Sequence, residues 1–534
     1  MKQKIYNIIL DAIKNIYPDL TELNFLVSAT EPQFGDYSSN VAMVLAKNVG
    51  EKPQVLAEKI IKEITELNSE IIESAEIAGP GFINFKISLA CFQKEVKNII
   101  GAAGGYGQTD LGADLKVNIE FISANPTGPL TLGNGRNAYF GDCLTRVLKA
   151  YGAKVETEYY VNDRGVQITT LGHSVLGDAE AVYKGAYIEE IASRISSKDP
   201  AEAGEEAAKI LLDEYVKKTI TKMGINFDLW FSEKSLHESN EVAKTLGILE
   251  NLGLVYKKED AVWLKTTDFG DDKDRVVVTS TGEYTYFASD IAYHYHKMNR
   301  GYNILIDFWG ADHHGYIGRL NAAIDMLRGD LDWGGQFKVM ICQLVRLMSN
   351  GQEVRMSKRA GNYVLLDELI DEVGPDVTRF FFLDRTLDTH MEFDLDLAKE
   401  KSDKNPVYYI QYAYARINSI LAKIDSLGLS FQTRGARDPG STSLIKEPEE
   451  IELIKKLIKL PELVEEIAGD YQVQKLAFYA RDLANSFHHF YEKCPVVKAS
   501  SPELTLARAE LLEATKIVLK NTLDLIGVSS PEKM

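Results

Sequence analysis

The sequence predicts an α/β protein built around a Rossmann-type parallel-sheet domain with a helical insertion. A small N-terminal α/β domain is expected before it and an all-helical C-terminal domain after it. Three observations support this: strand and helix patterns alternate from Leu115, strand patterns end near Lys401, and the glycine-rich stretch GAAGGYGQTDLGADL interrupts the chain. Since 534 residues are too many for one hydrophobic core, several domains are expected.

The first domain is predicted to span residues 1–110. Helical patterns alternate there with short strand patterns such as GFINFKI. Five glycines within residues 101–115 then break the periodicity, which is typical of a linker.

The central domain is predicted to span residues 111–395 and to begin with a βαβ unit. LKVNIEF reads as a strand, ISANPTGPLTLG as a turn and VETEYYV as the next strand. Between them a helix is expected to bury one face at 3.6-residue spacing, before Gly152 ends it. The crossover rule makes the two strands parallel. The residues on that face are Phe140, Leu144, Val147, Leu148 and Tyr151.

Two further regions are predicted to be helical. Residues from about 171 to 236 are mostly helical in pattern and charged, which indicates an insertion between two halves of the central domain. Residues 396–534 carry only long helical patterns, such as NPVYYIQYAYARINSILAKI, and predict a helical bundle. The polar segment SFQTRGARDPGSTS is expected to be a loop within that bundle.

Composition excludes several classes of protein. Hydrophobic residues make up 45% of the chain and charged residues 26%, which is ordinary for a globular protein. No apolar run approaches the roughly 20 residues of a membrane span, and charges at Asp11 and Lys14 interrupt any signal-peptide core. We therefore expect a cytoplasmic protein that does not enter a membrane.

Charge and cysteine content add two expectations. A formal net charge of −18 counts mildly against nucleic-acid binding, although an acidic protein can still carry a basic track. The four cysteines are far apart and form no CxxC pair, so neither a zinc site nor a disulfide framework is expected.

The segment ISANPTGPLTLGNGR is a candidate phosphate site because it joins a predicted strand to a predicted helix. A helix N-terminus presents unpaired N–H groups and a positive dipole end to anions. Pro126 and Pro129 stiffen the turn, and Gly133 allows a ligand to approach the backbone closely. Taken alone, the segment is equally well an ordinary strand-to-helix turn.

A second segment, LMSNGQEVRMSKRAGN, combines a turn signal with a basic loop. Asn350-Gly351 is the strongest short-range signal for a β-hairpin. The following Lys358 and Arg359 are cations that can approach phosphates. Taken alone, a solvated basic turn is the simpler interpretation.

Together these two segments resemble the two signatures of class I aminoacyl-tRNA synthetases. The usual HIGH tetrad is replaced here by TLGN, with Thr131 and Asn134 where the family has histidines, and Arg355 replaces the usual lysine of the second signature. Within class I the chain resembles the bacterial arginyl-tRNA synthetases. The stretches that carry this resemblance are EPQFGDYSSNVAMVLAK, AGPGFINF, SANPTGPL, EYYVNDRG, TYFASDIAYH, DFWGADHHGY, MSKRAGN, FDLDLA, NPVYYIQYAYAR and DLIGVSSPEKM.

The resemblance implies a two-step reaction for protein synthesis. L-Arginine would be activated with ATP to arginyl-adenylate and pyrophosphate, and then transferred to the 3′-terminal ribose of tRNA-Arg. Thr131, Asn134 and Lys358 would be catalytic, since Thr and Asn keep hydrogen-bond donors in place of the histidines. Mg²⁺ would accompany ATP, bound largely through phosphates and water. The resemblance places ATP against Gly133, Gly310, Asp312, His313, Met356 and Ser357.

The substrate arginine requires carboxylates, because its guanidinium is a planar cation with five donors. Glu120 ends the first strand and Asn125 begins the turn, so both can reach the carboxyl edge of the sheet. Tyr286 and Asp290 are four residues apart and share one face of a helix. By resemblance, Glu120 and Asn125 hold the amino-acid end, and Tyr286 and Asp290 the guanidinium.

Residues that contact tRNA are implied by the resemblance alone. They are Tyr37 and Asn40 in the first domain, and Tyr409, Tyr412 and Arg416 in the helical domain. Aromatic stripes on helices are core residues by default, whereas exposed ones stack on unpaired bases. A monomer is expected.

Three rival interpretations remain open. GADHHGY suggests a metal phosphohydrolase, but further carboxylates at the required spacings are missing. A noncatalytic tRNA-binding homologue could have lost activation along with the two histidines. A different nucleotidyl-transferring enzyme on the same fold is the third.

Overall fold

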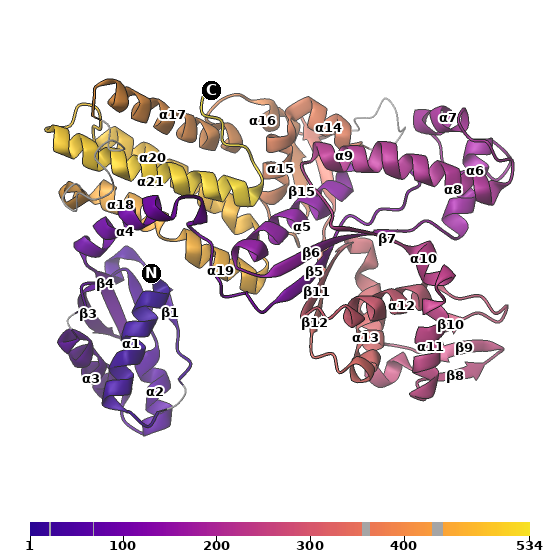
Figure 1. The fold of residues 1–534 in the computed structure, drawn as a ribbon, viewed down its shortest axis with the longest axis horizontal. Coiled ribbons are helices and arrows are strands. Elements are labelled where there is room, and N and C mark those ends of the chain that lie inside the picture. The colour runs from indigo at the N-terminus through magenta and orange to yellow at the C-terminus, as the bar shows by residue number, and fades with distance from the viewer. Residues whose placement is uncertain (21–22, 68, 355–363, 430–441) are drawn as a thin grey trace.

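The computed structural model describes residues 1–534 except 21–22, 68, 355–363 and 430–441. In Figure 1 the N-terminal domain lies below the helical C-terminal domain on one side of the molecule. The central parallel sheet lies between these two domains and the elements on the other side. The helical insertion and a small antiparallel sheet project on the other side. No helix within the described ranges is long and apolar enough to cross a bilayer.

The N-terminal domain is a four-stranded antiparallel sheet covered by helices, with the strand order β1-β2-β4-β3. Helix α1 (Lys2–Ile16) buries Ile5, Ile9 and Ile13, which recur at helical spacing. The other elements are β1 (Val27–Ala29), β2 (Tyr37–Ser39), α2 (Val41–Val49), α3 (Pro53–Glu66), β3 (Ile72–Ala78), β4 (Phe82–Ile87) and α4 (Leu89–Ala102).

The central sheet has five parallel strands in the order β12-β11-β5-β6-β7. The predicted βαβ unit is confirmed as β5 (Lys116–Glu120), α5 (Leu132–Ala150) and β6 (Lys154–Val161). The order reverses between β5 and β11, and ligands of open α/β sheets bind at such a switch point. The remaining strands and two covering helices are β7 (Leu229–Ser232), α12 (Tyr286–Asn299), β11 (Ile304–Gly310), α13 (Ile317–Leu331) and β12 (Gln336–Cys342).

Helix α5 differs from the one-faced helix expected for it. Besides the predicted apolar face, Arg136, Asn137 and Asp142 are also buried. The reason is that α5 is covered on several sides, by the sheet, by α15 (Pro375–Leu383) and by the C-terminal helices α19 (Leu460–Asp470) and α21 (Pro502–Ile526).

The helical insertion is shorter than the predicted 171–236. Its helices are α6 (Val166–Leu176), α7 (Ala186–Ala192), α8 (Pro200–Ile210), a π-helical turn (Leu211–Val216) and α9 (Lys217–Lys222). Residues 229–232, inside the predicted range, form β7, the edge strand of the central sheet. Four residues are too few to show a clear strand period, so the sequence pattern did not reveal this strand.

A small antiparallel sheet was also not anticipated. It has the order β10-β9-β8 and packs beside α12. Its elements and the two preceding helices are α10 (Glu233–Glu238), α11 (Glu241–Asn251), β8 (Val255–Lys258), β9 (Ala261–Leu264) and β10 (Arg275–Val278).

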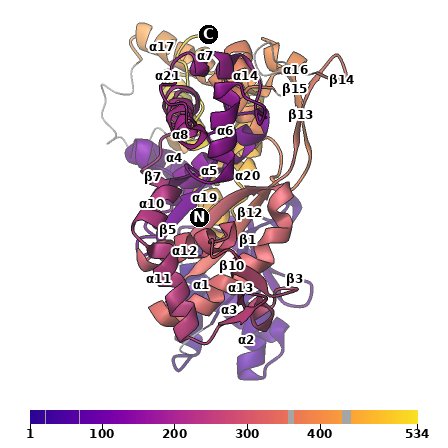
Figure 2. The same ribbon diagram turned by 90° about the vertical axis from the view of Figure 1, so that its right-hand side faces the viewer.

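The predicted Asn350-Gly351 hairpin is confirmed. It joins β13 (Val345–Ser349) to β14 (Gln352–Glu353), and both turn residues have positive φ, 50° and 72°. Figure 2 shows this hairpin projecting from the side of the molecule. The elements that follow are α14 (Leu366–Val373), α15 (Pro375–Leu383), β15 (Met391–Asp394) and α16 (Leu395–Lys399).

The C-terminal domain is a helical bundle, as predicted, and its described residues after Lys401 contain no strand. Its last helix packs against both α4 and α5, so the bundle joins the other two domains. Most of the predicted loop SFQTRGARDPGSTS lies outside the described residues. The helices are α17 (Pro406–Ser426), α18 (Pro448–Leu457), α19 (Leu460–Asp470), α20 (Gln474–Lys493) and α21 (Pro502–Ile526).

Candidate active site

A cavity of about 1190 Å³ opens at the carboxyl edge of the sheet, where β5 and β11 are neighbours. Residues of β5, α5, β6, α12 and β11 line it. Met356, Ser357 and Lys358 lie outside the described residues. Every other residue predicted to bind arginine or ATP, or to act in catalysis, lines this one cavity: Glu120, Asn125, Thr131, Gly133, Asn134, Tyr286, Asp290, Gly310, Asp312 and His313.

The tetrad forms the N-terminus of α5, with Thr131 as the N-cap residue. The carboxamide oxygen of Asn134 accepts from the Thr131 N–H (2.9 Å) and from the Thr131 hydroxyl (3.1 Å). The amide nitrogen of Asn134 has no hydrogen-bond partner among the described residues. It is therefore the side-chain donor available to a phosphate at the positive end of the helix.

The tetrad is also paired with the chain that follows the second signature. Leu132 N–H donates to the Val364 carbonyl (2.9 Å), and Leu366 N–H donates to the Leu130 carbonyl (2.9 Å). These bonds fix residues 364–366 beside the helix N-terminus. Residues beside the tetrad are thus paired through backbone with a segment more than 200 residues further along the sequence.

The turn after β5 is strained and is held from α5. Ile122 has φ 67°, which is costly for a β-branched residue. Its N–H donates to Asn137 Oδ1 (2.6 Å), and Asn137 Nδ2 donates to the Phe308 carbonyl (2.8 Å) of β11. Sequence reasoning missed Asn137, because one polar residue in a buried helix has no distinguishing pattern.

The predicted guanidinium pair lies in the first turns of α12, where Thr285 caps the helix by accepting from Ala288 N–H. Asp290 is buried and accepts from the Tyr316 hydroxyl. Burial raises the pKa of Asp290 to about 7, although the Tyr316 hydrogen bond lowers it. Tyr286 is 57% exposed at the mouth of the cavity, and the charge of Asp290 raises its pKa.

A second buried carboxyl group, Glu233, lines the same cavity. It begins α10 and interacts with Ser289 of α12, and burial raises its pKa to about 7. A cationic ligand would favour the ionised form of both carboxyl groups. Sequence reasoning missed Glu233 because it is one of many acidic residues in a charged, helical stretch.

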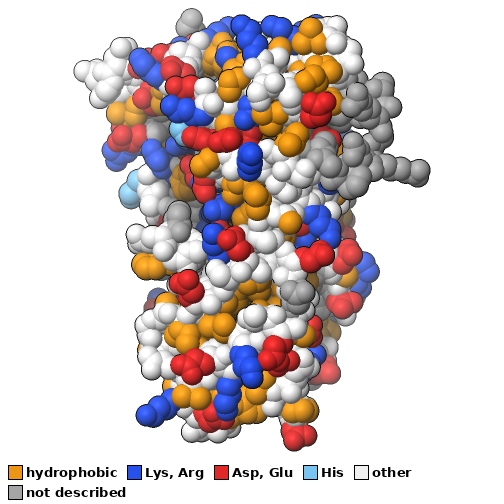
Figure 3. Space-filling model, turned by 90° about the vertical axis from the view of Figure 1, so that its left-hand side faces the viewer, with side chains coloured by type: hydrophobic (Ala, Val, Ile, Leu, Met, Phe, Trp, Pro, Cys, Tyr) orange, Lys and Arg blue, Asp and Glu red, His pale blue; other side chains and the backbone are white. Residues whose placement is uncertain are grey.

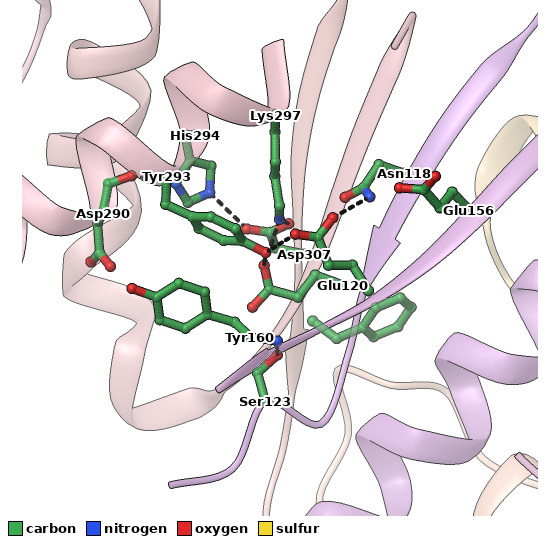
Figure 4. Close-up of polar contacts among 12 residues, drawn as sticks. Asn118, Glu120, Ser123, Glu156, Tyr160, Asp290, Tyr293, His294, Lys297 and Asp307 are labelled. Atoms are coloured by element: carbon green, nitrogen blue, oxygen red, sulfur yellow. Dashed lines mark hydrogen bonds and ion pairs between the residues drawn. The ribbon is translucent and has the colours of Figure 1, made fainter. Parts of the chain in front are cut away.

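Glu120 lies at the opposite side of the space that Asp290 faces (Figure 4). One of its carboxylate oxygens accepts from Tyr293 and from the buried Lys297. Burial raises the pKa of Glu120, against the charge of Lys297, which lowers it. The cavity thus has acidic groups at two ends and a helix N-terminus beside them.

Comparisons with known proteins match the whole organisation. Residues 3–87 match the sequence model of the arginyl tRNA synthetase N terminal domain, residues 175–381 that of the class I (R) tRNA synthetase catalytic domain, and residues 410–534 that of the DALR anticodon binding domain. An arginine--tRNA ligase of Citrifermentans bemidjiense is 40% identical, with 100% of both chains covered. The chain belongs to the arginyl-tRNA synthetase family.

Other relatives agree with this assignment. An arginine--tRNA ligase of Desulfosudis oleivorans is 44% identical over 526 residues, which cover 94% of this chain and 93% of that one. The solved structure of Thermus thermophilus arginyl-tRNA synthetase has a TM-score of 0.78 over 100% of both chains, at 21% identity, and shows the same fold.

The two residues of the first domain that family resemblance suggested as tRNA contacts differ in exposure. Tyr37 is 3% exposed, and its hydroxyl donates to Glu462 of α19 (2.8 Å). In the free protein it therefore joins the N-terminal and helical domains, and a contact of Tyr37 with tRNA stays a prediction. Asn40 is half-buried and accepts from Leu26 N–H (2.8 Å).

The helical domain has a second cavity, of about 780 Å³, which Tyr412 and Arg416 line. Arg416 donates to the Tyr412 hydroxyl (2.7 Å) and lies over the Tyr491 ring. Tyr409, in contrast, packs against His488 and does not line this cavity. Figure 3 shows Lys and Arg side chains gathered along the upper edge of the molecule, over this domain. The basic residues of the cavity itself are Arg416, Lys423, Lys498 and Lys533.

No group of three His, Cys, Asp or Glu residues within the described ranges could hold a metal ion. Asp312 and His313 of the GADHHGY stretch are both exposed and line the cavity of about 1190 Å³, with His313 Nε2 3.4 Å from Asp312 Oδ2. Two exposed ligands do not make a metal centre.

Proposed function

We propose that this chain is an arginine--tRNA ligase that activates L-arginine with ATP and esterifies it to tRNA-Arg at one site. The observation that carries the proposal is the composition of the cavity: buried Asp290 and Glu233 at one end, Glu120 at the other, and the N-terminus of α5 beside them. Arginine carries a guanidinium at one end and an α-ammonium group at the other, and these two cations suit the acidic groups at the two ends of the cavity. The phosphates of ATP suit the N-terminus of the helix.

The roles of the arginine-binding residues follow from charge. Asp290, with Tyr286 at the mouth, binds the guanidinium, and Glu233 provides a second carboxylate for it. Glu120 and Asn125 hold the amino-acid end. Arginine that binds between these groups presents its carboxylate to the helix N-terminus.

The first step is in-line attack of an arginine carboxylate oxygen on the α-phosphorus of ATP. The bond between the α-phosphorus and the bridging oxygen breaks, and pyrophosphate leaves. Asn134 donates to a phosphate oxygen as charge develops, Thr131 orients Asn134, and Lys358 neutralises the leaving pyrophosphate. Gly133, Gly310, Asp312, His313, Met356 and Ser357 complete the ATP site.

The second step transfers arginine to the terminal ribose of tRNA. A ribose hydroxyl attacks the carbonyl carbon of arginyl-adenylate, and AMP leaves. Asn40 in the first domain and Tyr409, Tyr412 and Arg416 in the helical domain are the proposed tRNA contacts; of these, Tyr412 and Arg416 have the best support, because they line a basic cavity.

Several finer points complete the proposal. Mg²⁺ enters with ATP and is held mainly by phosphates and water. The domains comprise residues 1–110, 111–395 and 396–534, the protein acts as a monomer, and it works in the cytoplasm.

The decisive experiment is aminoacylation with arginine, ATP, Mg²⁺ and tRNA-Arg, run beside ATP–pyrophosphate exchange with and without tRNA. We expect arginyl-tRNA to form and exchange to require tRNA, as the family resemblance implies. A protein that binds tRNA-Arg but forms no arginyl-tRNA would support the noncatalytic alternative.

A further inference from the structure

A buried network of charges connects the two ends of the proposed arginine pocket (Figure 4). Its centre is Lys297 of α12, whose side chain is 0% exposed. Lys297 Nζ contacts Glu120 of β5 and Asp307 Oδ1 of β11, the latter at 2.9 Å. Burying an ammonium is costly unless it is paired, and here it is paired with carboxylates from two adjacent strands.

We propose that Lys297 is a positioning residue for the substrate's α-amino group, because together with Tyr293 it holds one carboxylate oxygen of Glu120 and leaves the other facing the pocket. The inference rests on the proposed function, and it adds a residue that does not itself line the cavity. Lys297 acts on arginine only through Glu120.

The two carboxylate oxygens of Glu120 have different partners. Oε2 accepts from Lys297 Nζ and from the Tyr293 hydroxyl, the latter at 2.9 Å. Oε1 accepts no hydrogen bond from any described residue, and Glu120 lines the cavity. Lys297 and Tyr293 therefore fix the carboxylate plane and leave one oxygen to accept from an ammonium group.

Charge balance explains why the lysine matters. The buried carboxylates of the network are Glu120, Glu158 and Asp307, and its cations are Lys297, Arg300 and His294. His294 is counted as a cation because both its partners, Asp307 Oδ2 and the Asp290 carbonyl, are acceptors. Tyr293 donates to the network, Glu156 lies at its edge against Arg300, and Tyr160 adjoins it.

Removing Lys297 would leave these three buried carboxylates against two cations. Protonation of one carboxyl group would relieve the excess charge. Glu120 is the candidate, because without Lys297 the partner left to its Oε2 is the neutral Tyr293 hydroxyl, whereas Asp307 Oδ2 keeps its contact with His294. A neutral Glu120 accepts weakly from an ammonium, so the α-amino group would lose its partner.

The test compares arginine with 5-guanidinopentanoate, which is arginine without its α-amino group. The variants are Lys297→Met, Glu120→Gln and the double variant, in the full-length enzyme with tRNA. Binding is measured as the KM for arginine, as the inhibition constant of 5-guanidinopentanoate, and by direct titration if a variant is inactive. Lys222→Met, which removes a lysine paired with Asp371 outside the cavity, is the matched control.

We expect Lys297→Met to weaken arginine binding about 30-fold, the lower range for an unpaired charge in a buried site. Binding of 5-guanidinopentanoate and of ATP should change less than about twofold, and Lys297→Met should add almost nothing to Glu120→Gln. Equal losses for arginine and 5-guanidinopentanoate would show that Lys297 only supports the fold. Additive losses in the double variant would show that it does not act through Glu120.

A second variant and a parallel measurement on the wild type separate the possible results. If Lys297→Met does not fold, Tyr293→Phe removes the other donor to Glu120 Oε2 and should give the same pattern at smaller size; equal losses for both ligands would then overturn the proposal. Wild-type aminoacylation is measured in parallel. Its absence would refute the proposed function, whereas the binding pattern of the variants tests Lys297 separately.

Discussion

The edge of the central sheet and the helical domain both carry residues that were predicted from the sequence to bind substrates. The residues at the sheet edge lie together in the structure, whereas those in the helical domain lie in different environments. At the sheet edge, ten predicted residues from β5, α5, α12, β11 and the turns beside them line one cavity. In the helical domain, the aromatic residues and Arg416 of the stretch Tyr408–Arg416 lie in different environments: Tyr414 is buried, Tyr409 packs on His488, and Tyr412 and Arg416 line the cavity of about 780 Å³.

Topology explains the difference. Parallel strands end at the same edge, so the sequence position of a residue relative to its strand already locates it near the site. On a helix a residue's function depends on which face is covered, and that depends on partners distant in sequence. The following predictions test whether charge at the sheet edge dominates function and the helical cavity only modulates it.

The largest effect is expected for Asp290→Asn. The guanidinium would enter a buried pocket without its main anionic partner, so kcat/KM for arginine should fall by about 3–5 kcal/mol. The KM for ATP should change little, because the proposed ATP contacts are on other elements. Steady-state exchange kinetics in the presence of tRNA measure both. Loss of ATP binding with intact arginine binding would show that the pocket is assigned to the wrong substrate.

Lys358→Ala should have the next largest effect. Lys358 lies outside the described residues, and its role rests on the second signature. Its charge should stabilise the leaving pyrophosphate chiefly in the transition state, so activation should slow by about 2–4 kcal/mol with little change in arginine affinity. Single-turnover activation measures this. An unchanged rate would exclude this lysine from the mechanism.

The sequence was sufficient to predict the three-domain order, the β5–α5–β6 unit and the Asn350-Gly351 turn, because each rests on local periodicity or turn chemistry. It was insufficient for Asn137, Glu233 and Lys297, whose roles arise from contacts across the fold. Tyr37 was assigned by resemblance, and its environment is formed by Glu462, more than 400 residues away. Distant contacts of this kind leave no periodic pattern.

The altered tetrad gives a graded prediction. Thr131 and Asn134 were expected to donate to phosphate separately, but the Thr131 hydroxyl donates to Asn134. Asn134→Ala should therefore slow activation by about 1–3 kcal/mol, and Thr131→Val by less, near the lower end of that range. Single-turnover activation separates the two, and tRNA binding should persist in both. A larger loss for Thr131→Val would show that its hydroxyl contacts ATP directly.

The pH dependence of arginine binding should follow Asp290. Burial raises the pKa of Asp290 from 3.8 to about 7, so the free pocket is protonated below pH 7, and arginine binding must release that proton. The KM for arginine should fall as pH rises toward about 7, by up to tenfold per pH unit, and level off above it. Over the same window this carboxyl group destabilises the free fold as pH rises. Asp290→Asn should flatten the profile of KM against pH; an unchanged profile would assign the titration to another group such as Glu233.

The smallest effect is expected in the helical cavity, for Arg416→Ala. Arg416 lies over the Tyr491 ring and donates to Tyr412, so its loss removes both a charge and a planar surface for stacking on a base. The KM for tRNA should rise by the equivalent of about 1 kcal/mol, and the dependence of binding on salt should weaken by about one phosphate contact. Arg416→Lys is the matched variant: it retains the charge, so it should keep the salt dependence and lose only the stacking part. Tyr412→Phe keeps the ring and removes the oxygen that accepts from Arg416, and it should have a weaker effect than either. If all three variants bind tRNA-Arg as the wild type does across salt concentrations, the basic cavity is not part of the tRNA surface, and the contrast between the two regions becomes one between a functional edge and a purely structural bundle.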